Sequence, residues 1–282
     1  MTLAYWNGAC LPLDQVKVSP LDRGFLFADG VYEVVAVYDG RIFELDAHLD
    51  RLARSLAAVR IDPGLDRAGL AVVFERLAAD APRPAATIYM QVTRGAPAQR
   101  SHAFPAGARA SILAFAGALK RLGRTQQEQG FALVSAPDIR WLRCDIKSIA
   151  LLPSVLAAQQ AAEAGVLETV MLRDGLVSEC AASNVFVVKD GRVATPAADH
   201  RILDGINRRI AIRLAEELGI AVEQRDVVEA ELREADEIWI TSTTKELAPI
   251  VRLDGAAVGG GRPGPMWRRV RDAFDNLVGQ PA

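Results

Sequence analysis

Apolar and polar residues alternate in the first part of the chain, with two breaks that suit tight turns. Asn7-Gly8 divides the apolar runs of residues 5–13, and Asp39-Gly40 divides the alternating residues 31–45. Alternation with a period of two indicates half-buried strands, and Asn-Gly or Asp-Gly between two such runs favours a β-hairpin. We therefore predict hairpins at the start of the chain.

Helical spacing replaces this alternation from Leu45 to Val59, where Leu49, Leu52 and Leu56 fall on the same face as Leu45. Apolar residues that recur three and four positions apart predict a helix with one buried face. The same reasoning predicts a helix at 66–80 and strands at 86–93 and 110–116.

A polar stretch, residues 119–130, follows and is interpreted as a linker. Beyond it, apolar runs and the glycines that end them predict strands at 131–137, 168–196 and 236–243, and helices at 154–165, 206–219 and 266–277. Strands and helices do not alternate regularly, so we expect an α+β fold rather than a doubly wound sheet. The expected domains are an N-terminal domain at 1–118 and a C-terminal domain at 131–282.

Composition and charge argue against several classes of protein. Of the 282 residues, 50% are hydrophobic and 24% are charged, and the formal net charge is -2. A basic surface that would bind phosphate backbones is therefore not expected, which argues against nucleic acid as a partner. The N-terminus lacks a signal-peptide pattern, and no apolar run is long enough to span a bilayer, so we expect no membrane partner.

The chain has three cysteines, Cys10, Cys144 and Cys180, at irregular spacing. An odd, scattered set suits neither a disulfide framework nor a zinc site. We therefore expect no metal, and a reducing cytoplasm is the simplest location for the protein.

Lys147 is the first residue whose chemistry needs an explanation. It lies in the otherwise apolar stretch 143–157, just before a predicted helix, although lysine is rarely buried without a partner. One interpretation is a side chain that extends along apolar surface to solvent. The other is an amine required as a nucleophile, because desolvation penalises the ammonium form and a neutral amine attacks carbonyl carbon.

Glu179 is the second candidate. It follows a glycine-containing turn and is followed by the small residues 180–183. A carboxylate flanked by small side chains suits a flat ligand that approaches closely. A solvated glutamate beside a turn explains the same pattern, so both interpretations stay open.

Three further segments offer groups that could bind an anion. Arg51 lies on a predicted helix, where it either holds an anionic oxygen or pairs at the surface with Asp50 or Glu44. Residues 204–208 open a helix, and the first N–H groups of a helix attract anions. Residues 241–246 add hydroxyl groups after a buried strand. Together these segments supply the arginine, the helix N-terminus and the hydroxyls of a phosphate site.

A loop rich in glycine and proline contains Arg100 and His102. In extended backbone, alternate residues point the same way, so a guanidinium and an imidazole could converge on one carboxylate. The planar fork of arginine matches a carboxylate through two hydrogen bonds. A solvated loop with no ligand is the alternative.

In this order the motifs resemble one family, the fold-type IV pyridoxal-phosphate enzymes, and within it the D-amino-acid transaminases. The resemblance covers nearly the whole chain. It rests on GVYEV (30–34), HLDRL (48–52), RSHAFP (100–105), CDIKSIALLP (144–153), SECAASNVF (178–186), ILDGINR (202–208) and STT (242–244).

The resemblance implies roles for individual residues. Lys147 would form a Schiff base with pyridoxal 5'-phosphate and then carry a proton between the substrate Cα and the cofactor. Glu179 would face the pyridine nitrogen and keep it protonated. The remaining cofactor contacts would come from Arg51, Leu203, Ile206, Asn207, Ser242 and Thr243, and the substrate α-carboxylate would be held by Tyr32, Arg100 and His102.

The resemblance also implies a fold, an assembly and a reaction. The fold would be a smaller N-terminal α/β domain and a larger C-terminal domain with a mixed, barrel-like sheet. The reaction would be transamination between a D-amino acid and a 2-oxo acid, of the D-alanine and 2-oxoglutarate type. The arginine and histidine of the loop would reach in from the neighbouring subunit, which implies an obligate homodimer.

Three positions depart from the family pattern. Asn207 stands where a threonine is frequent, Ala182 where a serine is common, and Ala150 where an asparagine is frequent. Each change removes or replaces a polar group, so these positions bear on the affinity for the cofactor.

Other activities of the same fold remain alternatives. A branched-chain L-amino-acid transaminase, an (R)-amine transaminase or an aminodeoxychorismate lyase would keep Lys147 and Glu179. The first and last of these are not expected to use arginine-x-histidine as a carboxylate site. From a different class, a vitamin-B6-binding module without catalysis is a further alternative, which the complete set of candidate catalytic residues argues against.

Overall fold

The computed structural model describes residues 2–279 of the chain. These residues form two compact units, and the chain passes between the units more than once. The first unit is Met1–Lys120 together with Ile146–Leu151, and the second is Arg121–Asp145 together with Leu152–Ala282. Each unit is described by itself below.

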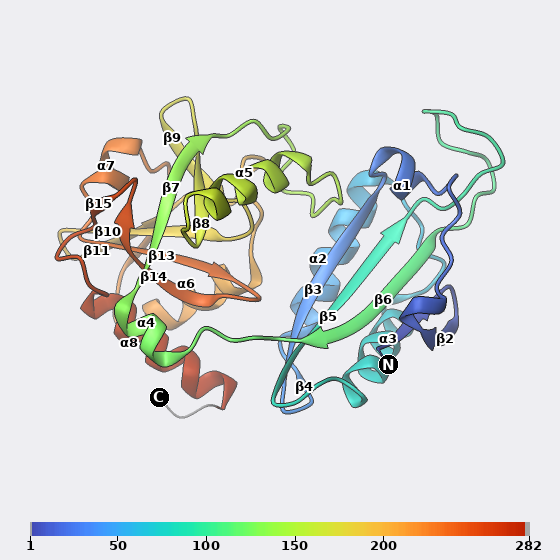
Figure 1. Ribbon diagram of the computed structural model, residues 1–282, viewed down its shortest axis with the longest axis horizontal. Helices are drawn as coiled ribbons and strands as arrows, with labels where there is room; N and C mark the ends of the chain where they lie inside the picture. The colour runs from blue at the N-terminus through green and yellow to red at the C-terminus, as the bar shows by residue number, and fades with distance from the viewer. Residues whose placement is uncertain (1, 280–282) are drawn as a thin grey trace. The chain divides into compact units, whose positions relative to one another are not determined.

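The first unit is an antiparallel sheet with two helices on one face (Figure 1). Its six strands run in the order β2-β1-β6-β5-β3-β4, and α2 and α3 cover the sheet. Its elements are β1 Leu3–Trp6, β2 Ala9–Pro12, the 3-10 helix η1 Leu13–Gln15, α1 Arg23–Phe27, β3 Gly30–Tyr38, β4 Arg41–Ile42, α2 Leu45–Val59, α3 Arg67–Ala79, β5 Ala85–Thr93 and β6 Ser111–Ala118.

Alternation along β3 explains how this sheet meets its helices. Val31 and Val35 belong to one core cluster with Leu49, Leu52 and other residues of α2. Burying apolar side chains from both elements is the dominant favourable term for such a contact. Because successive residues of a strand point to opposite faces, the sheet presents a second set of side chains away from the helices.

That second face carries a row of aromatic side chains. Tyr32 of β3 packs on Tyr89 of β5, with ring centroids 5.7 Å apart, and Tyr89 packs on Phe115 of β6 at 5.4 Å. The register pairs Tyr89 directly with Phe115 and places Tyr32 two residues along from the partner of Tyr89. The strand pairing therefore determines where Tyr32 lies.

The second unit is built on a mixed sheet in the order β12-β11-β10-β13-β14-β7-β8-β9, with β15 beside β14. The β11–β12, β14–β7 and β7–β8 pairs are parallel, and the other pairs are antiparallel. Its elements are α4 Arg124–Gln129, β7 Phe131–Pro137, α5 Leu152–Glu163, β8 Glu168–Arg173, β9 Leu176–Cys180, β10 Asn184–Lys189, β11 Arg192–Thr195, α6 Ile206–Glu217, β12 Val222–Gln224, α7 Glu229–Arg233, β13 Glu237–Ser242, β14 Glu246–Leu253, β15 Ala256–Ala257 and α8 Pro265–Val278.

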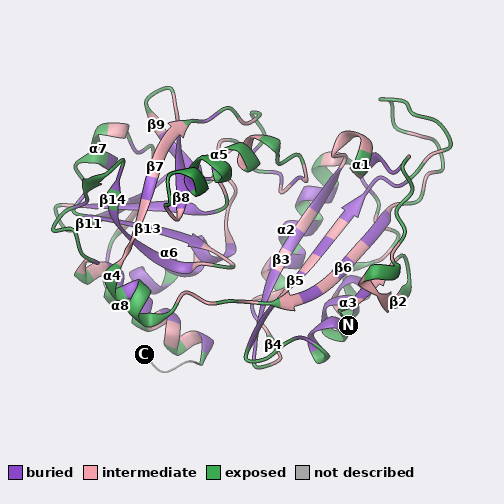
Figure 2. Ribbon diagram, viewed as in Figure 1, coloured by how far each residue is buried: buried purple, intermediate pink, exposed green. Residues whose placement is uncertain are grey.

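This sheet curls around its own core. Val177 and Cys180 of the last strand belong to the same apolar cluster as Val185 and Val187 of β10 and Ala194 of β11, near the other end of the strand order. Figure 2 shows β10, β13 and β14 largely buried, whereas much of α5 is exposed. The result is the mixed, barrel-like sheet that the sequence motifs imply.

The periodic segments of the sequence are reproduced closely. The helix predicted at 45–59 is α2, and that predicted at 66–80 is α3 at 67–79. Residues 119–130, interpreted as a linker, contain the helix α4. Within residues 2–279, no helix is both long and apolar enough to cross a membrane.

Candidate active site

Lys147 lies in the short non-helical segment Ile146–Leu151 of the first unit. Its carbonyl accepts a hydrogen bond from the N–H of Tyr32 (3.0 Å), and its own N–H donates to Oγ of Ser55 on α2 (3.2 Å). The Lys147 Nζ atom is 4.2 Å from the centre of the Tyr32 ring. The segment therefore holds Lys147 and Tyr32 side by side, with the lysine half-buried.

Gly30 explains why the chain can approach β3 so closely. The N–H of Ile149 donates to the Gly30 carbonyl, and a Cβ at Gly30 would lie 3.0 Å from Cδ1 of Ile149 and 2.6 Å from the Val92 carbonyl oxygen. Only glycine fits this position without displacing the backbone of β5. The glycine of the GVYEV motif thus permits the attachment of the lysine segment.

Arg51 is buried, and its partner is Glu33 of β3. Arg51 donates from Nε and Nη2 to the two oxygens of Glu33, at 2.8 and 2.7 Å, and His48 Nδ1 lies 2.7 Å from Glu33 Oε2. The alternative of a surface pair with Asp50 or Glu44 is wrong in the structure, because β3 brings a carboxylate under α2. Asp50 pairs with Arg67 instead.

The Glu33–His48–Arg51 cluster has a definite charge state. Burial would raise the pKa of Glu33, but the Arg51 charge and the hydrogen bonds from Arg51 and His48 outweigh burial and hold that pKa well below its usual range. Burial lowers the pKa of His48 more than the contact with Glu33 raises it. The cluster is therefore an ionised carboxylate, a guanidinium and a neutral imidazole at neutral pH.

Glu179 is the penultimate residue of β9 in the second unit and is buried. Its carboxylate accepts hydrogen bonds from Nη1 of Arg140, from Nδ2 of Asn184 (3.0 Å) and from the N–H of Leu203 (3.2 Å to each oxygen). The interpretation of Glu179 as a solvated turn residue is therefore wrong. Three donors hold this carboxylate in one orientation.

Arg140 is held in turn by Asp138. Nε and Nη2 of Arg140 donate to the two oxygens of Asp138 at 2.9 and 2.8 Å, and Arg173 and the Ser178 hydroxyl also contact Asp138. Burial would raise the pKa of Asp138, but Arg140 outweighs it and lowers the pKa to about 2. Two carboxylates, Asp138 and Glu179, thus share the guanidinium of Arg140.

The start of α6 and the end of β13 lie together in the second unit. Asn207, in the first turn of α6, donates from Nδ2 to the carbonyl of Ser242 at 2.7 Å. Gly205 is the N-cap residue, and within the part of the chain that the structure describes, no side chain caps α6. A side chain at Gly205 would overlap the Asn184 amide. The first N–H groups of α6 are therefore available to an anion, next to the hydroxyls of Ser242 and Thr243.

These groups fit a phosphorylated pyridine cofactor. The second unit offers a fixed carboxylate, Glu179, hydrogen-bonded to the N–H of Leu203, and three residues later α6 begins with its uncapped N-terminus. A carboxylate suits a protonated ring nitrogen, and a helix N-terminus with hydroxyls suits a phosphate. The donor set thus matches both ends of pyridoxal 5'-phosphate.

Two of the departures from the family pattern have a structural explanation. The amide of Asn207 is used to fasten α6 to Ser242. The N–H of Ala182 donates to Glu168 Oε1 at 2.9 Å, and Lys245 lies 3.5 Å from the same oxygen. A backbone contact therefore holds the turn at Ala182, where the side chain has no polar group. Ala150 is exposed, and nothing in the structure explains its substitution.

Arg100 and His102 converge on one aromatic ring in the first unit. The guanidinium carbon of Arg100 is 4.8 Å from the centre of the Phe27 ring, and the His102 ring is 5.1 Å from it. Both residues are exposed. Both side chains therefore contact Phe27, and their joint binding of a carboxylate stays a prediction.

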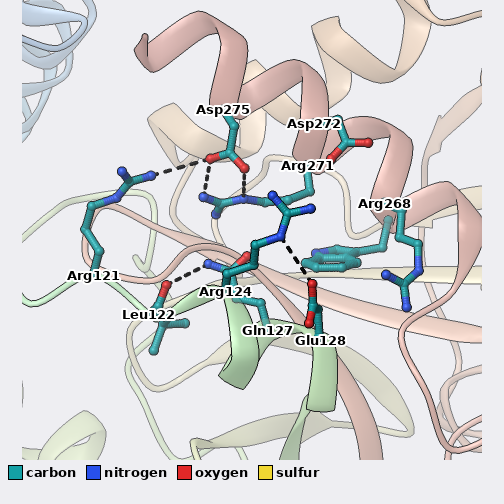
Figure 3. Close-up of a pocket in the computed structure, with 11 residues that line it drawn as sticks. Arg121, Leu122, Arg124, Gln127, Glu128, Arg268, Arg271, Asp272 and Asp275 are labelled. Carbon is teal, nitrogen blue, oxygen red and sulfur yellow. Dashed lines mark hydrogen bonds and ion pairs between the residues drawn. The ribbon is translucent and has the colours of Figure 1, made fainter. Parts of the chain in front are cut away.

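A cavity of about 370 Å³ in the second unit is lined by none of these residues. It is lined by α4 and α8 and contains four arginines, Arg121, Arg124, Arg268 and Arg271, with acidic partners among them (Figure 3). Arg121 and Arg271 both pair with Glu246 and Asp275. The buried charges of this cavity are already compensated, so it has the character of a structural ion-pair network.

The sequence did not single out Glu33, Arg140, Asp138 or Asn184. The signal for Glu33 was available, since it occupies an inward position of β3 between two buried valines. A charge at such a position requires a buried partner. For Arg140 no local signal existed, because its partner Glu179 is distant in the sequence. Within residues 2–279, no group of three or more candidate ligands could hold a metal ion.

Comparison with known protein families assigns the chain to one of them. The amino-transferase class IV family matches residues 30–253, which is most of the chain, and the chain belongs to this family. It is therefore an aminotransferase of fold type IV. The resemblance stated from the motifs is confirmed.

Among its relatives are D-alanine aminotransferases. The chain is 40% identical to that of Bacillus licheniformis, over 97% of this chain and 96% of the relative, and 36% identical to that of Staphylococcus haemolyticus, over 99% and 98%. The solved branched-chain amino acid aminotransferase of Escherichia coli has a similar structure, with a TM-score of 0.92 and 27% identity over 99% of this chain and 96% of that one. The fold is thus shared by aminotransferases that are named for different substrates.

Proposed function

We propose that this aminotransferase transfers the amino group between D-amino acids and 2-oxo acids, with D-alanine and 2-oxoglutarate as the type. The observation that carries the proposal is the contact of Arg100 and His102 with one ring, that of Phe27. A guanidinium and an imidazole so placed suit one carboxylate. The D-alanine aminotransferases among the relatives support the same substrate class.

Pyridoxal 5'-phosphate, when bound, supplies an aldehyde that bonds to amines and a ring that stabilises negative charge at the substrate Cα. The amine of Lys147 would hold the cofactor through that aldehyde, with loss of water, and would carry the proton at Cα once the substrate amine has displaced it. Glu179, held by three donors, would keep the ring nitrogen protonated. The phosphate would be held by Arg51, Ile206, Asn207, Ser242 and Thr243, and Leu203 would pack on the ring.

Handedness follows from where the carboxylate is held. A D-amino acid and its L-enantiomer present the same Cα–H bond to Lys147 only if carboxylate and side chain exchange places. A site that binds the carboxylate at Tyr32, Arg100 and His102 therefore accepts one enantiomer. Lys147 and Tyr32 lie side by side, so the proton-moving amine and one part of the carboxylate site share the first unit.

We propose in addition a homodimer in which Arg100 and His102 serve the neighbouring subunit. The exposure of both side chains in the single chain supports this. The outer face of α5 also exposes Leu152, Val155 and Leu156, which a partner subunit would cover. A cytoplasmic location agrees with the free thiols of Cys10, Cys144 and Cys180.

The test is to mix the holoenzyme with single D- and L-amino acids and to monitor each half-reaction by the loss of the cofactor absorption band. D-alanine should react faster than L-alanine or L-leucine. Arg100→Ala should weaken transition-state binding of D-alanine by about 2–4 kcal/mol, because the substrate carboxylate loses its arginine partner. This loss corresponds to a decrease in kcat/KM on the order of 30- to 1,000-fold.

Amines without a carboxylate serve as the control. D-alaninol has the configuration of D-alanine but no carboxylate, so Arg100→Ala should change its rate much less. Faster turnover of L-alanine or L-leucine in the wild type, or unchanged D-alanine turnover in Arg100→Ala, would overturn the D-specific proposal in favour of the branched-chain alternative.

A further inference from the structure

Residues 100–104, here called the carboxylate loop, have exposed side chains but a fixed backbone. The guanidinium of Arg23 donates from Nη1 to the carbonyl of Ser101 and, at 3.3 Å, to that of Ala103, and from Nη2 to that of His102 at 3.1 Å. Three consecutive carbonyls of the loop are thus bound by one side chain. Arg23 itself is only 4% exposed.

Arg23 is oriented by a carboxylate. Its Nε donates to Asp29 Oδ2 at 2.7 Å, which leaves the two Nη groups for the loop. Asp29 also binds Arg94 through both oxygens, at 2.8 and 2.9 Å, and Arg94 lies 3.6 Å above the Phe104 ring. Burial would raise the pKa of Asp29, but these two arginines outweigh burial and lower it.

The helix α1 that carries Arg23 also carries Phe27, one turn later. Phe27 is the residue that contacts the side chains of both Arg100 and His102. α1 thus binds the loop twice, at its backbone through Arg23 and at its two functional side chains through Phe27. The N-cap of α1, Asp22, is itself fastened by the hydroxyl of Ser111 at 2.8 Å.

The base of the loop is closed independently. A Cβ at Gly95 would overlap the carbonyl of Arg109, so the segments before and after the carboxylate loop meet there. The backbone N–H of Arg23 also donates to the Gly95 carbonyl at 2.9 Å. The loop would therefore stay attached without the Arg23 side chain. What the side chain adds is a single arrangement of the loop tip.

The carbonyls that Arg23 binds belong to exposed residues, which water could satisfy. The bonds are therefore not required to compensate a buried polar group of the loop. Their effect is to order the backbone from which Arg100 and His102 extend, and a catalytic or binding group must be held close to its productive geometry.

The geometry points to Arg23 as the positioning residue of the carboxylate loop, an inference that rests on the proposed function of Arg100 and His102. Arg23 does not touch the substrate. It sets where the guanidinium and the imidazole meet the α-carboxylate, through the three carbonyls. Lysine could not replace it, because one ammonium cannot bind Asp29 and three carbonyls in a plane.

The test compares Arg23→Met, Arg23→Lys and a control, Arg67→Met, in the holoenzyme. Arg67 is a half-exposed arginine of the same unit that pairs with carboxylates, Asp46 and Asp50, but within residues 2–279 binds no carbonyl of the carboxylate loop. Arg23→Met should raise KM for D-alanine and lower kcat/KM on the order of 100-fold, since displacement by about 1 Å has that effect. Arg23→Lys should recover only part of the loss, and Arg67→Met should match the wild type.

A double-mutant cycle distinguishes positioning from a loss of fold. In a background with Arg100→Ala and His102→Ala, Arg23 has nothing left to position, so adding Arg23→Met should change the single-turnover rate with D-alanine less than about threefold. If Arg23→Met costs the same factor in both backgrounds, or leaves KM unchanged in the wild type, the inference is wrong. If instead the Arg100→Ala, His102→Ala background reacts with D-alanine as the wild type does, the proposed function fails first.

Discussion

Each unit of this aminotransferase contains a buried cluster of arginine and carboxylate, and the two clusters use their charges in opposite ways. In the first unit, Glu33 lies under Arg51 and His48. In the second unit, Arg140 lies beside Glu179 and Asp138. In the proposed site the working group of the first cluster is the cation, Arg51, and that of the second is the anion, Glu179.

The comparison teaches how a protein presents a charge to a ligand from a buried position. A buried charge without a partner is costly, so each working group has an opposite charge behind it. Glu33 is completely buried and holds Arg51, and Arg140 similarly holds Glu179. Glu179 has two more donors, Asn184 and the Leu203 N–H, whereas Arg51 depends on Glu33 for the two contacts described.

Removing the amine of Lys147 would show whether the two clusters bind the cofactor without a covalent bond. Lys147→Ala should abolish turnover of D-alanine, because the amine that bonds to the cofactor and moves the proton is lost. The cofactor should still bind, through the groups around Arg51 and Glu179. The measurements are steady-state turnover, cofactor titration and the unfolding curve.

Peptide mapping provides the control for this variant. Borohydride reduction of the wild-type holoenzyme should place the pyridoxyl group on Lys147, and Lys245→Ala should leave it there. A label on Lys245 or Lys189 would contradict the assignment.

The second cluster should control chemistry more than binding. Glu179→Gln keeps the shape but removes the negative charge beside the ring nitrogen, so the proton-transfer steps should slow on the order of 100-fold. The cofactor spectrum should change, while KM for D-alanine should change little. Unchanged rates would mean that another residue faces the ring nitrogen.

Glu33→Gln is the matched change in the first cluster and should have the complementary effect. Arg51 loses its counter-charge, so the cofactor should bind on the order of tenfold more weakly, as expected for the loss of about 1.4 kcal/mol. At saturating cofactor, turnover should remain near that of the wild type. A slowed chemical step at saturation would show that the clusters are not divided in this way.

The fold was largely predictable because its signals are local. The spacing of Leu45, Leu49, Leu52 and Leu56 predicted α2 with both ends correct, and the Asp39-Gly40 turn located the hairpin of β3 and β4. The polar stretch 119–130 was less informative because α4 has no apolar spacing that predicts a helix. Glutamine side chains at its start instead bond to the backbone, Gln126 to the N–H of Gly123 and Gln127 to the carbonyl of Leu122.

The sequence motifs singled out Lys147, Glu179 and Arg51 as candidate site residues, and their roles stay predictions. The same motifs gave no indication of the residues that contact them. Arg140 and Glu179 are 39 positions apart, and Arg23 and Ser101 are 78 apart. Such contacts follow from tertiary packing of segments, which no local pattern contains. The exception is Glu33, because a charged residue at an inward position of a strand predicts a buried partner.

The smallest expected effect concerns His48 and is a dependence of stability on pH. Its folded pKa is lowered, chiefly by burial, with Arg51 and Lys147 adding to the decrease and Glu33 opposing it. An unfolded histidine has a pKa of about 6.5. Below that pH the unfolded chain binds a proton that the folded chain does not, so the free energy of unfolding should decrease as pH falls, by at most about 1.4 kcal/mol per pH unit.

The carboxylates of the two clusters act in a different window. The pKa of Asp138 is lowered to about 2 and that of Glu33 is lowered as well, so their stabilisation is complete only above about pH 5 and is lost as pH falls further. Between about pH 5 and 6.5 the slope due to His48 should therefore be separable from that of these carboxylates. Urea unfolding at fixed protein concentration should show a flatter pH dependence for His48→Asn, whose amide can still donate to Glu33. Equal slopes in both proteins would mean that the imidazole gains its proton without loss of stability, and that the first cluster tolerates a second cation beside Arg51.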